Sequence, residues 1–213
     1  MLLTLVKRMF HRSGATPVES RRASSGVPLR LHIGGEQAHP DWKILNIQPG
    51  PGVDFVGSCH DLSAFADSTV AEIYASHVLE HLGYQSALPH ALAEMRRALM
   101  PCAALRVSVP DLAVLAELLV DPSTSLQESV HVMRMMFGGQ MDENDFHHVG
   151  FSFEILAAFL RDAGFEAIER VKGFNLFDDT STLVFRDRPI SLNVQARKPA
   201  VNKIGRASCR ERV

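Results

Sequence analysis

Short runs rich in β-branched residues alternate with segments of helical periodicity over most of this chain of 213 residues. Such alternation is typical of a mostly parallel sheet with helices on both faces. The seven expected strands span residues 29–33, 43–47, 53–56, 70–75, 104–109, 167–171 and 190–196. Helices are expected at residues 86–99, 112–119, 126–136 and 153–163. The sequence therefore predicts an α/β fold built on one seven-stranded sheet.

Composition indicates an ordinary globular chain with one well-buried core. Hydrophobic residues make up 46%, charged residues 22%, and the formal net charge is −2. Without a Lys/Arg-rich face, a nucleic-acid partner held through its phosphates is not expected, and a small-molecule or glycan ligand fits better. The three scattered cysteines form no C-x-x-C pair, which favours a reducing compartment and a cytoplasmic location.

The two ends of the chain are set apart from the domain expected at residues 28–199. Residues 1–27 are rich in Arg and Ser and are expected to be a basic, disordered tail, with a transit peptide or a membrane-surface helix as alternatives. Residues 200–213 are expected to be a second tail. Residues 204–213, IGRASCRERV, match one reading frame of a common sequencing adapter, so we expect them to be artefactual. No apolar run is long enough to predict integral membrane contact, and the sequence does not predict the oligomeric state.

The stretch AEIYASHVLEHL at residues 71–82 is the strongest indication of function. A buried strand is expected to end there in the polar residues Ser76, His77, Glu80 and His81. Ligands of open α/β sheets bind beyond the carboxyl ends of the strands. The polar residues therefore stand where a ligand is expected.

Two interpretations of this stretch compete. HVLEH matches H-x-x-E-H, the inverted zinc-protease signature, in which two histidines bind metal and a glutamate acts as base. That signature belongs inside a helix, whereas here it directly follows a strand, and no third ligand stands out. The other interpretation is a methyltransferase.

Three ordered segments carry a resemblance to a known family. They are HDLSAF (residues 60–65), EIYASHVLEHL (72–82) and LAEMRRALMPCAALRVSVPDL (92–112). This series resembles class I S-adenosylmethionine-dependent methyltransferases, which have a Rossmann-like fold. Bacterial predicted methyltransferases of type-11-like character share LHIGG (31–35), GGQ (138–140), DFH (145–147) and ISLNV (190–194). The resemblance covers about residues 28–199.

The resemblance implies S-adenosylmethionine as cofactor and assigns residues to it. In the family a G-x-G-x-G turn follows the first strand and a carboxylate ends the second. This chain instead has Gly34 and Gly35 in the turn, and Asn46 and Gln48 as neutral candidates for the ribose. The residues expected beside the adenine are Asp61 and Leu62, and Ser76 and His77 complete the expected cofactor site.

The connection between the first two strands is unusually short. Only residues 36–41 follow the glycines, whereas a crossover between parallel strands usually takes a dozen residues or more. Either the crossover is abbreviated or the expected strand limits are wrong.

A base is needed if the methyl acceptor is a hydroxyl or an amine, and histidine suits this role near neutral pH. The candidates are His147, which we favour, His148 and His81, with His77 as a further possibility. Asp142, Asp145, His147 and His148 match no established metal-site spacing, so we expect no metal. The expected function is methyl transfer to a small-molecule, glycan or lipid-linked acceptor. The alternative is a catalytically inactive binding or scaffold protein with the same fold.

Overall fold

The computed structural model describes residues 28–200 of the chain. The tail expected at residues 1–27 and all but the first residue of the tail expected at 200–213 therefore lie outside the described residues. The main sheet contains β1 (Leu29–Ile33), β2 (Lys43–Asn46), β3 (Phe55–Val56), β4 (Val70–Ser76), β5 (Leu99–Pro110), β6 (Glu166–Val171) and β9 (Ser191–Arg197). The helices are α1 (Ala87–Ala98), α2 (Leu112–Val120), α3 (Leu126–Phe137) and α4 (Phe153–Asp162). Among the described residues, no helix has the length and apolar character needed to cross a membrane.

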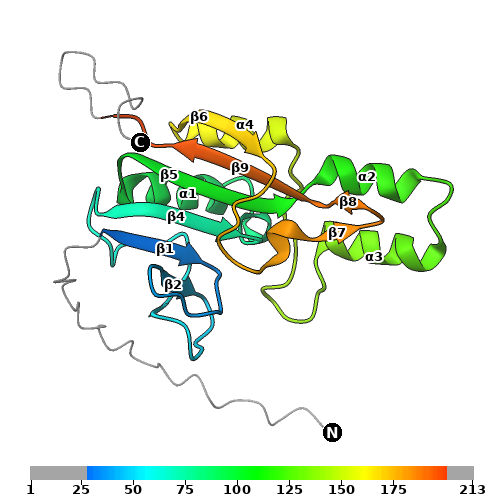
Figure 1. Ribbon diagram of the computed structural model, residues 1–213, viewed down its shortest axis with the longest axis horizontal. Helices are drawn as coiled ribbons and strands as arrows, with labels where there is room; N and C mark the ends of the chain where they lie inside the picture. The colour runs from blue at the N-terminus through cyan, green and yellow to red at the C-terminus, as the bar shows by residue number, and fades with distance from the viewer. Residues whose placement is uncertain (1–27, 201–213) are drawn as a thin grey trace, which may run out of the picture.

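The seven strands pair in the order β3-β2-β1-β4-β5-β9-β6 (Figure 1). The pairs from β3 to β5 are parallel, whereas β9 is antiparallel to both β5 and β6. All seven expected strands are present, and β1 has the expected bounds. The predicted α/β class and mostly parallel sheet are confirmed.

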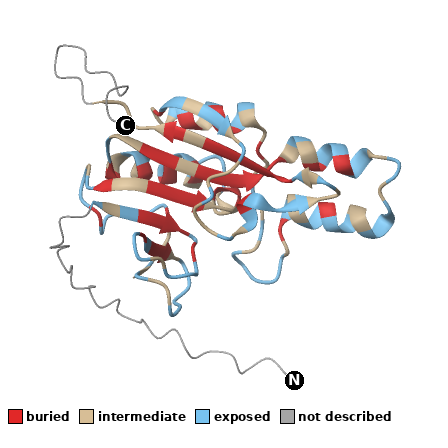
Figure 2. Cartoon of the chain, in the orientation of Figure 1, coloured by how far each residue is buried: buried red, intermediate tan, exposed pale blue. Residues whose placement is uncertain are grey.

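One face of the sheet packs against α1 and α4 and forms the main core. Fully buried Leu92 and Met95 of α1 and Leu156 and Leu160 of α4 belong to the same apolar cluster as Ile73 of β4. Arg96 of α1 also donates a hydrogen bond to the carbonyl of Gly164, just after α4 (3.1 Å). Figure 2 shows the buried residues concentrated in the central strands and on the inner sides of these helices.

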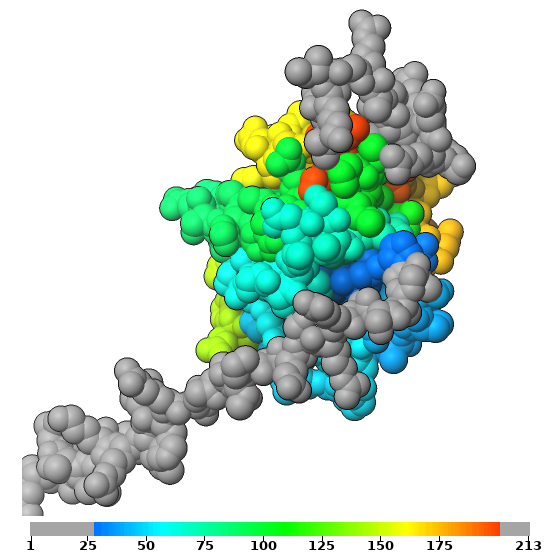
Figure 3. Space-filling model, turned by 90° about the vertical axis from the view of Figure 1, so that its left-hand side faces the viewer, coloured from blue at the N-terminus to red at the C-terminus, as the bar shows by residue number. Residues whose placement is uncertain are grey.

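The opposite face is covered differently from the expectation of helices on both faces. Among the described residues, it carries the segment 172–183, whose Phe177 ring stacks on Tyr74 of β4 with centroids 5.1 Å apart. His32 of β1 and Trp42 also contact Phe177. Figure 3 shows α1 (green) and the orange segment after β6 on opposite sides of the molecule.

The short first crossover explains this difference. Residues 34–42 connect β1 to β2, too few for a helix that must also return to the start of the next strand. The abbreviated crossover is therefore real, and it supplies no helix to cover this face. Accordingly the strands carry charges on this face: Glu72 contacts Arg30 (3.5 Å) and Arg106 (2.7 Å) across three strands.

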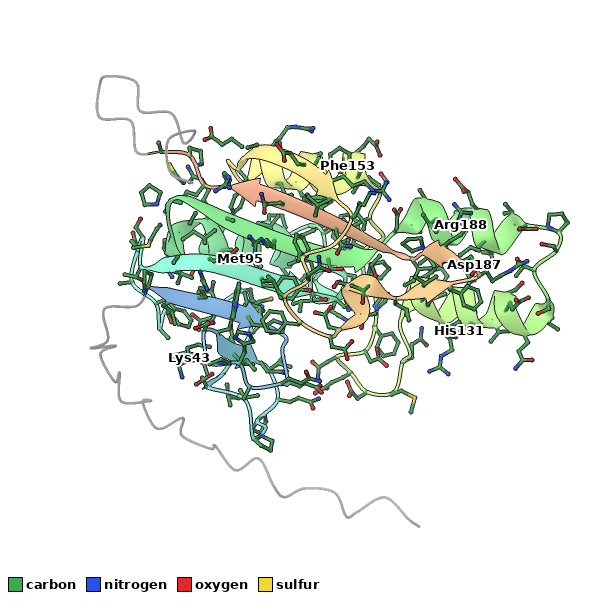
Figure 4. All side chains as sticks on the ribbon, viewed as in Figure 1. Lys43, Met95, His131, Phe153, Asp187 and Arg188 are labelled. Carbon is green, nitrogen blue, oxygen red and sulfur yellow. The ribbon has the colours of Figure 1, made fainter. Side chains whose placement is uncertain are left out.

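An arm extends beyond the carboxyl ends of the central strands. It consists of α2, α3 and a small hairpin of β7 (Val184–Phe185) and β8 (Arg188–Pro189). Figure 4 shows Asp187 and Arg188 of the hairpin beside the two helices, with His131 on α3. The sequence did not predict the hairpin, because strands of two residues give no periodic pattern.

Candidate functional site

A cavity of about 930 Å³ opens at the carboxyl ends of four neighbouring strands. Its walls include Gly34 after β1, Asn46 and Gln48 at the end of β2, residues 57–60 after β3, and residues 77–78 and 81–83 after β4. Pockets of roughly 300–1,000 Å³ are the usual size for small-molecule and cofactor sites. The cavity therefore has both the position and the size of a ligand site in an open α/β sheet.

The two glycines of the first turn are required by close packing. Gly34 has φ +80°, and a Cβ atom there would lie 2.4 Å from a methyl carbon of Val78. A Cβ on Gly35 would lie 2.4 Å from Nδ1 of His32. Gly34 lines the cavity, whereas Gly35 and Ser76 line a smaller neighbouring pocket of about 330 Å³ that includes Phe177 and Asp179. The expected cofactor residues are thus divided between two adjoining hollows.

The two residues expected at the ribose, Asn46 and Gln48 at the end of β2, differ in their hydrogen bonds. The Asn46 amide nitrogen donates to the carbonyl of Gly35 (3.1 Å), and its oxygen accepts from the backbone N–H of Gln48 (3.0 Å). Asn46 therefore holds the first turn against β2. Gln48 is exposed and lines the cavity, so it is the residue with an amide available to a ligand.

The residues expected beside the adenine do not line the cavity. Leu62 is fully buried in the main core. The exposed carboxylate of Asp61 accepts from the backbone N–H of Ser63 (3.1 Å), and hydrogen bonds from Ser63 lower the pKa of this carboxyl. Asp61 thus closes a local turn, and the backbone N–H of Leu62 donates to the Glu94 carboxylate (3.3 Å), so both residues lie outside the cavity lining.

The residues just before them do line the cavity. Ser58, Cys59 and His60 line the cavity, and the Ser58 hydroxyl lies 2.8 Å from Nδ1 of His60. Burial raises the pKa of the Cys59 thiol to about 11, so this thiol is not a nucleophile. Their position in the sequence could have identified Ser58 and His60 as cavity residues. They follow the carboxyl end of β3, just as Gly34 follows the carboxyl end of β1.

The residues after β4 do not form the helix that an inverted zinc protease requires. His77 has φ +53°, and only Leu79–His81 form a short 3-10 helix, labelled η1. His77 and His81 are therefore not on consecutive turns of one α-helix. His77 Nε2 lies 3.0 Å from the Ser191 hydroxyl, and its Nδ1 lies 3.3 Å from the Glu80 carboxylate.

The segment of residues 145–149 is fixed against η1 by backbone contacts. The N–H of His148 donates to the carbonyl of Glu80 (2.7 Å), and the N–H of His147 donates to the carbonyl of Phe137 (3.2 Å). These contacts place the His147 ring against that of His81, with centroids 4.8 Å apart. Burial is the largest influence on His147 and lowers its pKa, which favours a neutral ring.

The expected base residues therefore separate into two groups. His81 and His148 line the cavity, whereas His147, which we favoured, is not among the residues that line it. His147 instead lies with Glu80 and His81, and one side-chain ligand atom from each of the three falls within 4.8 Å of the others. Sequence spacing gave no indication of this group, because His147 is far from Glu80 along the chain.

The cavity wall carries negatively charged side chains. Four acidic residues line it, namely Glu36, Asp142, Glu143 and Asp145, and no Lys or Arg belongs to the lining among residues 28–200. Hydrogen bonds from the N–H groups of Met141 and Gly139 lower the pKa of Asp145, so this carboxylate is ionised near neutral pH. The wall therefore favours a cationic ligand and disfavours a phosphorylated one.

Comparisons with known proteins agree with this architecture. No protein-family model matches the chain, and neither does any curated protein sequence. Among solved structures, a SAM-dependent methyltransferase from Archaeoglobus fulgidus superposes with a TM-score of 0.53 at 14% identity, over 81% of this chain and 87% of that chain. A chain in the Haloferax volcanii complex of the Trm112 methyltransferase activator with a methyltransferase gives a TM-score of 0.50 at 14% identity, over 84% of this chain and 86% of that chain. The chain therefore has the fold of the class I S-adenosylmethionine-dependent methyltransferases.

Proposed function

We propose that this protein binds S-adenosylmethionine in the 930 Å³ cavity and transfers its methyl group to a small-molecule, glycan or lipid-linked acceptor. The observation that carries the proposal is a cavity at the carboxyl ends of the strands whose charged lining residues are all acidic apart from histidine. The cofactor combines a sulfonium cation with an amino group and has no phosphate. Dinucleotides, the other common ligands of such sheets, carry a pyrophosphate.

The first turn supports this choice of cofactor. Dinucleotide sites hold the pyrophosphate at the N-terminus of a helix that begins directly after the glycine turn. Here the turn at Gly34 and Gly35 leads into the short connection of residues 36–42, which contains no helix. The chain thus lacks, at this turn, the element that binds pyrophosphate.

Several residues of this chain fit individual parts of the cofactor. The exposed Gln48 amide at the end of β2 can hydrogen-bond a ribose hydroxyl, and Ser58 and His60 after β3 are available to the adenine. Gly34, which follows β1, gives the methionine part close access to the backbone. When bound, the cofactor supplies an electrophilic methyl group, and the protein needs only to align the acceptor.

For an acceptor that loses a proton, we propose His148 as the base in place of His147. His148 is exposed and lines the cavity, whereas His147 faces Glu80 and His81. Imidazole accepts protons near neutral pH, which suits a hydroxyl or amine acceptor.

A panel of ligands tests the proposal by thermal unfolding of the full chain. S-adenosylhomocysteine and S-adenosylmethionine should raise the melting temperature by several degrees at saturating concentration, because they bind only the folded state. NAD⁺ and ATP at the same concentrations should not. A shift with the phosphorylated ligands alone would replace the proposal by a nucleotide site, and no shift with any of them would favour a scaffold protein.

A further inference from the structure

Glu80 is a buried acidic residue without a hydrogen-bond partner. It is 1% exposed, and neither oxygen of its carboxylate is hydrogen-bonded within the described part of the chain. Nδ1 of His77 lies 3.3 Å from Oε1, but the contact is not aligned as a hydrogen bond. A buried carboxylate usually needs a partner charge or a metal ion.

Two histidines present free ring nitrogens beside this carboxylate. His81 Nδ1 lies 3.1 Å from the carbonyl of Phe146, and because a carbonyl only accepts, Nδ1 must carry the proton. Its Nε2 therefore has a free lone pair. A ring nitrogen of His147 lies within 4.8 Å of ligand atoms of both Glu80 and His81. A ring nitrogen bound to a backbone carbonyl is the usual support of a metal-binding histidine, since it fixes the tautomer.

The hydrogen bond of His77 to Ser191 determines which of its ring nitrogens carries the proton when the ring is neutral. The Ser191 hydroxyl donates its one proton to the carbonyl of Thr180 (2.8 Å). It can therefore only accept from His77 Nε2, which must carry the proton. In a neutral ring this leaves the lone pair of Nδ1 directed toward the Glu80 carboxylate, so a neutral His77 offers that carboxylate no hydrogen-bond donor.

We propose that Glu80, His81 and His147 bind a divalent transition-metal ion, with zinc the best match to the ligands. Two imidazoles and one carboxylate are a common set of catalytic zinc ligands and leave one position open. Magnesium and calcium prefer oxygen ligands alone. Donor atoms around a tetrahedral zinc ion lie about 3.3–3.4 Å apart, so ligand atoms that lie within 4.8 Å of one another must close by at most about 1.5 Å through side-chain rotation.

The site adjoins the cavity without depending on the proposed methyl transfer. His81 belongs both to the three ligands and to the cavity wall, so the ion would lie at the edge of the cavity. Binding of the metal alone needs no cofactor and no acceptor. A negative cofactor titration and a negative metal titration are therefore separate results. The proposal replaces the expectation of a metal-free protein.

A competing explanation needs no metal. A protonated His77 would pair with Glu80, and this ion pair would satisfy the buried carboxylate by itself. The two explanations differ in what happens when Glu80 becomes neutral. Loss of an ion pair destabilises the protein, whereas loss of an unpaired buried anion stabilises the metal-free protein.

Titration with zinc chloride and cobalt chloride tests the proposal on the untagged full chain after removal of metals with a chelator. Wild-type protein should bind one zinc ion, and cobalt should give the visible absorption of a site with nitrogen and oxygen ligands. Glu80→Gln and His147→Asn should each weaken zinc binding at least tenfold. His148→Asn is the matched control, because His148 is the next residue but is not one of the three ligands, and it should bind zinc like the wild type. Equal binding by all four proteins, or none by the wild type, would overturn the proposal.

Thermal unfolding of the same variants provides the second measurement and also verifies their folding. Without metal, Glu80→Gln should melt at the same or a higher temperature than the wild type. Zinc should raise the melting temperature of the wild type by several degrees and leave that of Glu80→Gln unchanged. A Glu80→Gln protein that is less stable than the metal-free wild type, together with no effect of zinc on either, would establish the ion pair with His77 instead.

Discussion

At the scale of single residues, the polar face of the sheet contains a histidine that cannot readily be charged. His32 is 5% exposed, its ring lies 4.1 Å from that of Phe177, and its Nδ1 has no hydrogen-bond partner within residues 28–200. Burial lowers the pKa of His32 to about 4 and outweighs the opposing attraction of Asp179. The neutral ring therefore belongs to the aromatic cluster that takes the place of a helix on this face.

His32 makes stability depend on pH in a defined direction. In the unfolded chain the pKa is about 6.5, so between pH 6.5 and 4 the unfolded state binds the extra proton. Stability should fall by about 2–3 kcal/mol as the pH drops through this range. His32→Phe keeps an aromatic ring and should remove this part of the pH dependence, measured by urea unfolding at several pH values. His90→Phe, on the exposed side of α1, should keep it, and an unchanged slope in His32→Phe would contradict the assignment.

Gln48 offers a test of the cofactor pose. An aspartate in its place restores the carboxylate that the family usually has at the end of the second strand, and charged hydrogen bonds are about twice as strong as neutral ones. Gln48→Asp should therefore bind S-adenosylhomocysteine roughly tenfold more tightly by calorimetry. Gln127→Asp, exposed on α3, makes the same change away from the cavity and should leave affinity unchanged. Weaker or equal binding by Gln48→Asp would show that Gln48 does not contact the ribose.

At the scale of elements, one buried residue connects the sheet to the arm. Asp111 follows β5 and caps α2, where its Oδ1 accepts from the N–H of Ala113 (3.2 Å). Its Oδ2 accepts from Arg170 of β6 (2.6 Å), and the carboxylate is 1% exposed. Asp111 therefore fixes the direction in which α2 leaves the sheet.

Removal of this cap should be costly. A lost N-cap is worth about 1 kcal/mol, and the half-exposed Arg170 adds a smaller amount because water screens it. Asp111→Ala should thus lower the unfolding free energy by about 1.5 kcal/mol and the melting temperature by roughly 3–6 °C. Asp162→Ala, at the exposed end of α4, should change stability by less than about 0.5 kcal/mol. A loss no larger than that of Asp162→Ala would show that α2 is held by its apolar contacts alone.

The sequence predicted elements well where the pattern is local. The four helices were expected within one or two residues, because caps and apolar stripes mark them in the sequence; the side chain of Ser152, for example, caps α4. β5 begins at Leu99, five residues before the expected start at Ala104. Leu99 pairs with Val70 of β4, and the register then shifts before Ala104 pairs with Glu72, so the start of this strand lacks a regular pattern. The cover of the polar face depends on Phe177, which lies far from β4 in the chain, so local patterns could not reveal it.

At the scale of the whole molecule, the sheet topology predicted where the cavity lies. It did not predict which side chains come together there. The carboxyl ends of β1, β2 and β4 meet at one edge, as a parallel sheet requires, and this predicted where the cavity lies. Ser58 and His60 line the cavity and Asp61 does not; motif matching selected Asp61 because it ignores which side chains turn toward the cavity. The juxtaposition of Glu80 with His147 depends on how residues 145–149 pack against η1, and no spacing along the chain encodes that contact.

The central claim is that the cavity at the carboxyl ends of the strands is a site for S-adenosylmethionine. Calorimetric titration of S-adenosylhomocysteine into the full chain and into Ser58→Trp tests it most directly, because Ser58 lines the cavity after β3 and a tryptophan there would fill the expected place of the adenine. The account predicts one binding site in the wild type and at least tenfold weaker binding in Ser58→Trp, with both proteins melting at similar temperatures without ligand. No heat of binding to the wild type at millimolar ligand, or equal affinity in the two proteins, would contradict it.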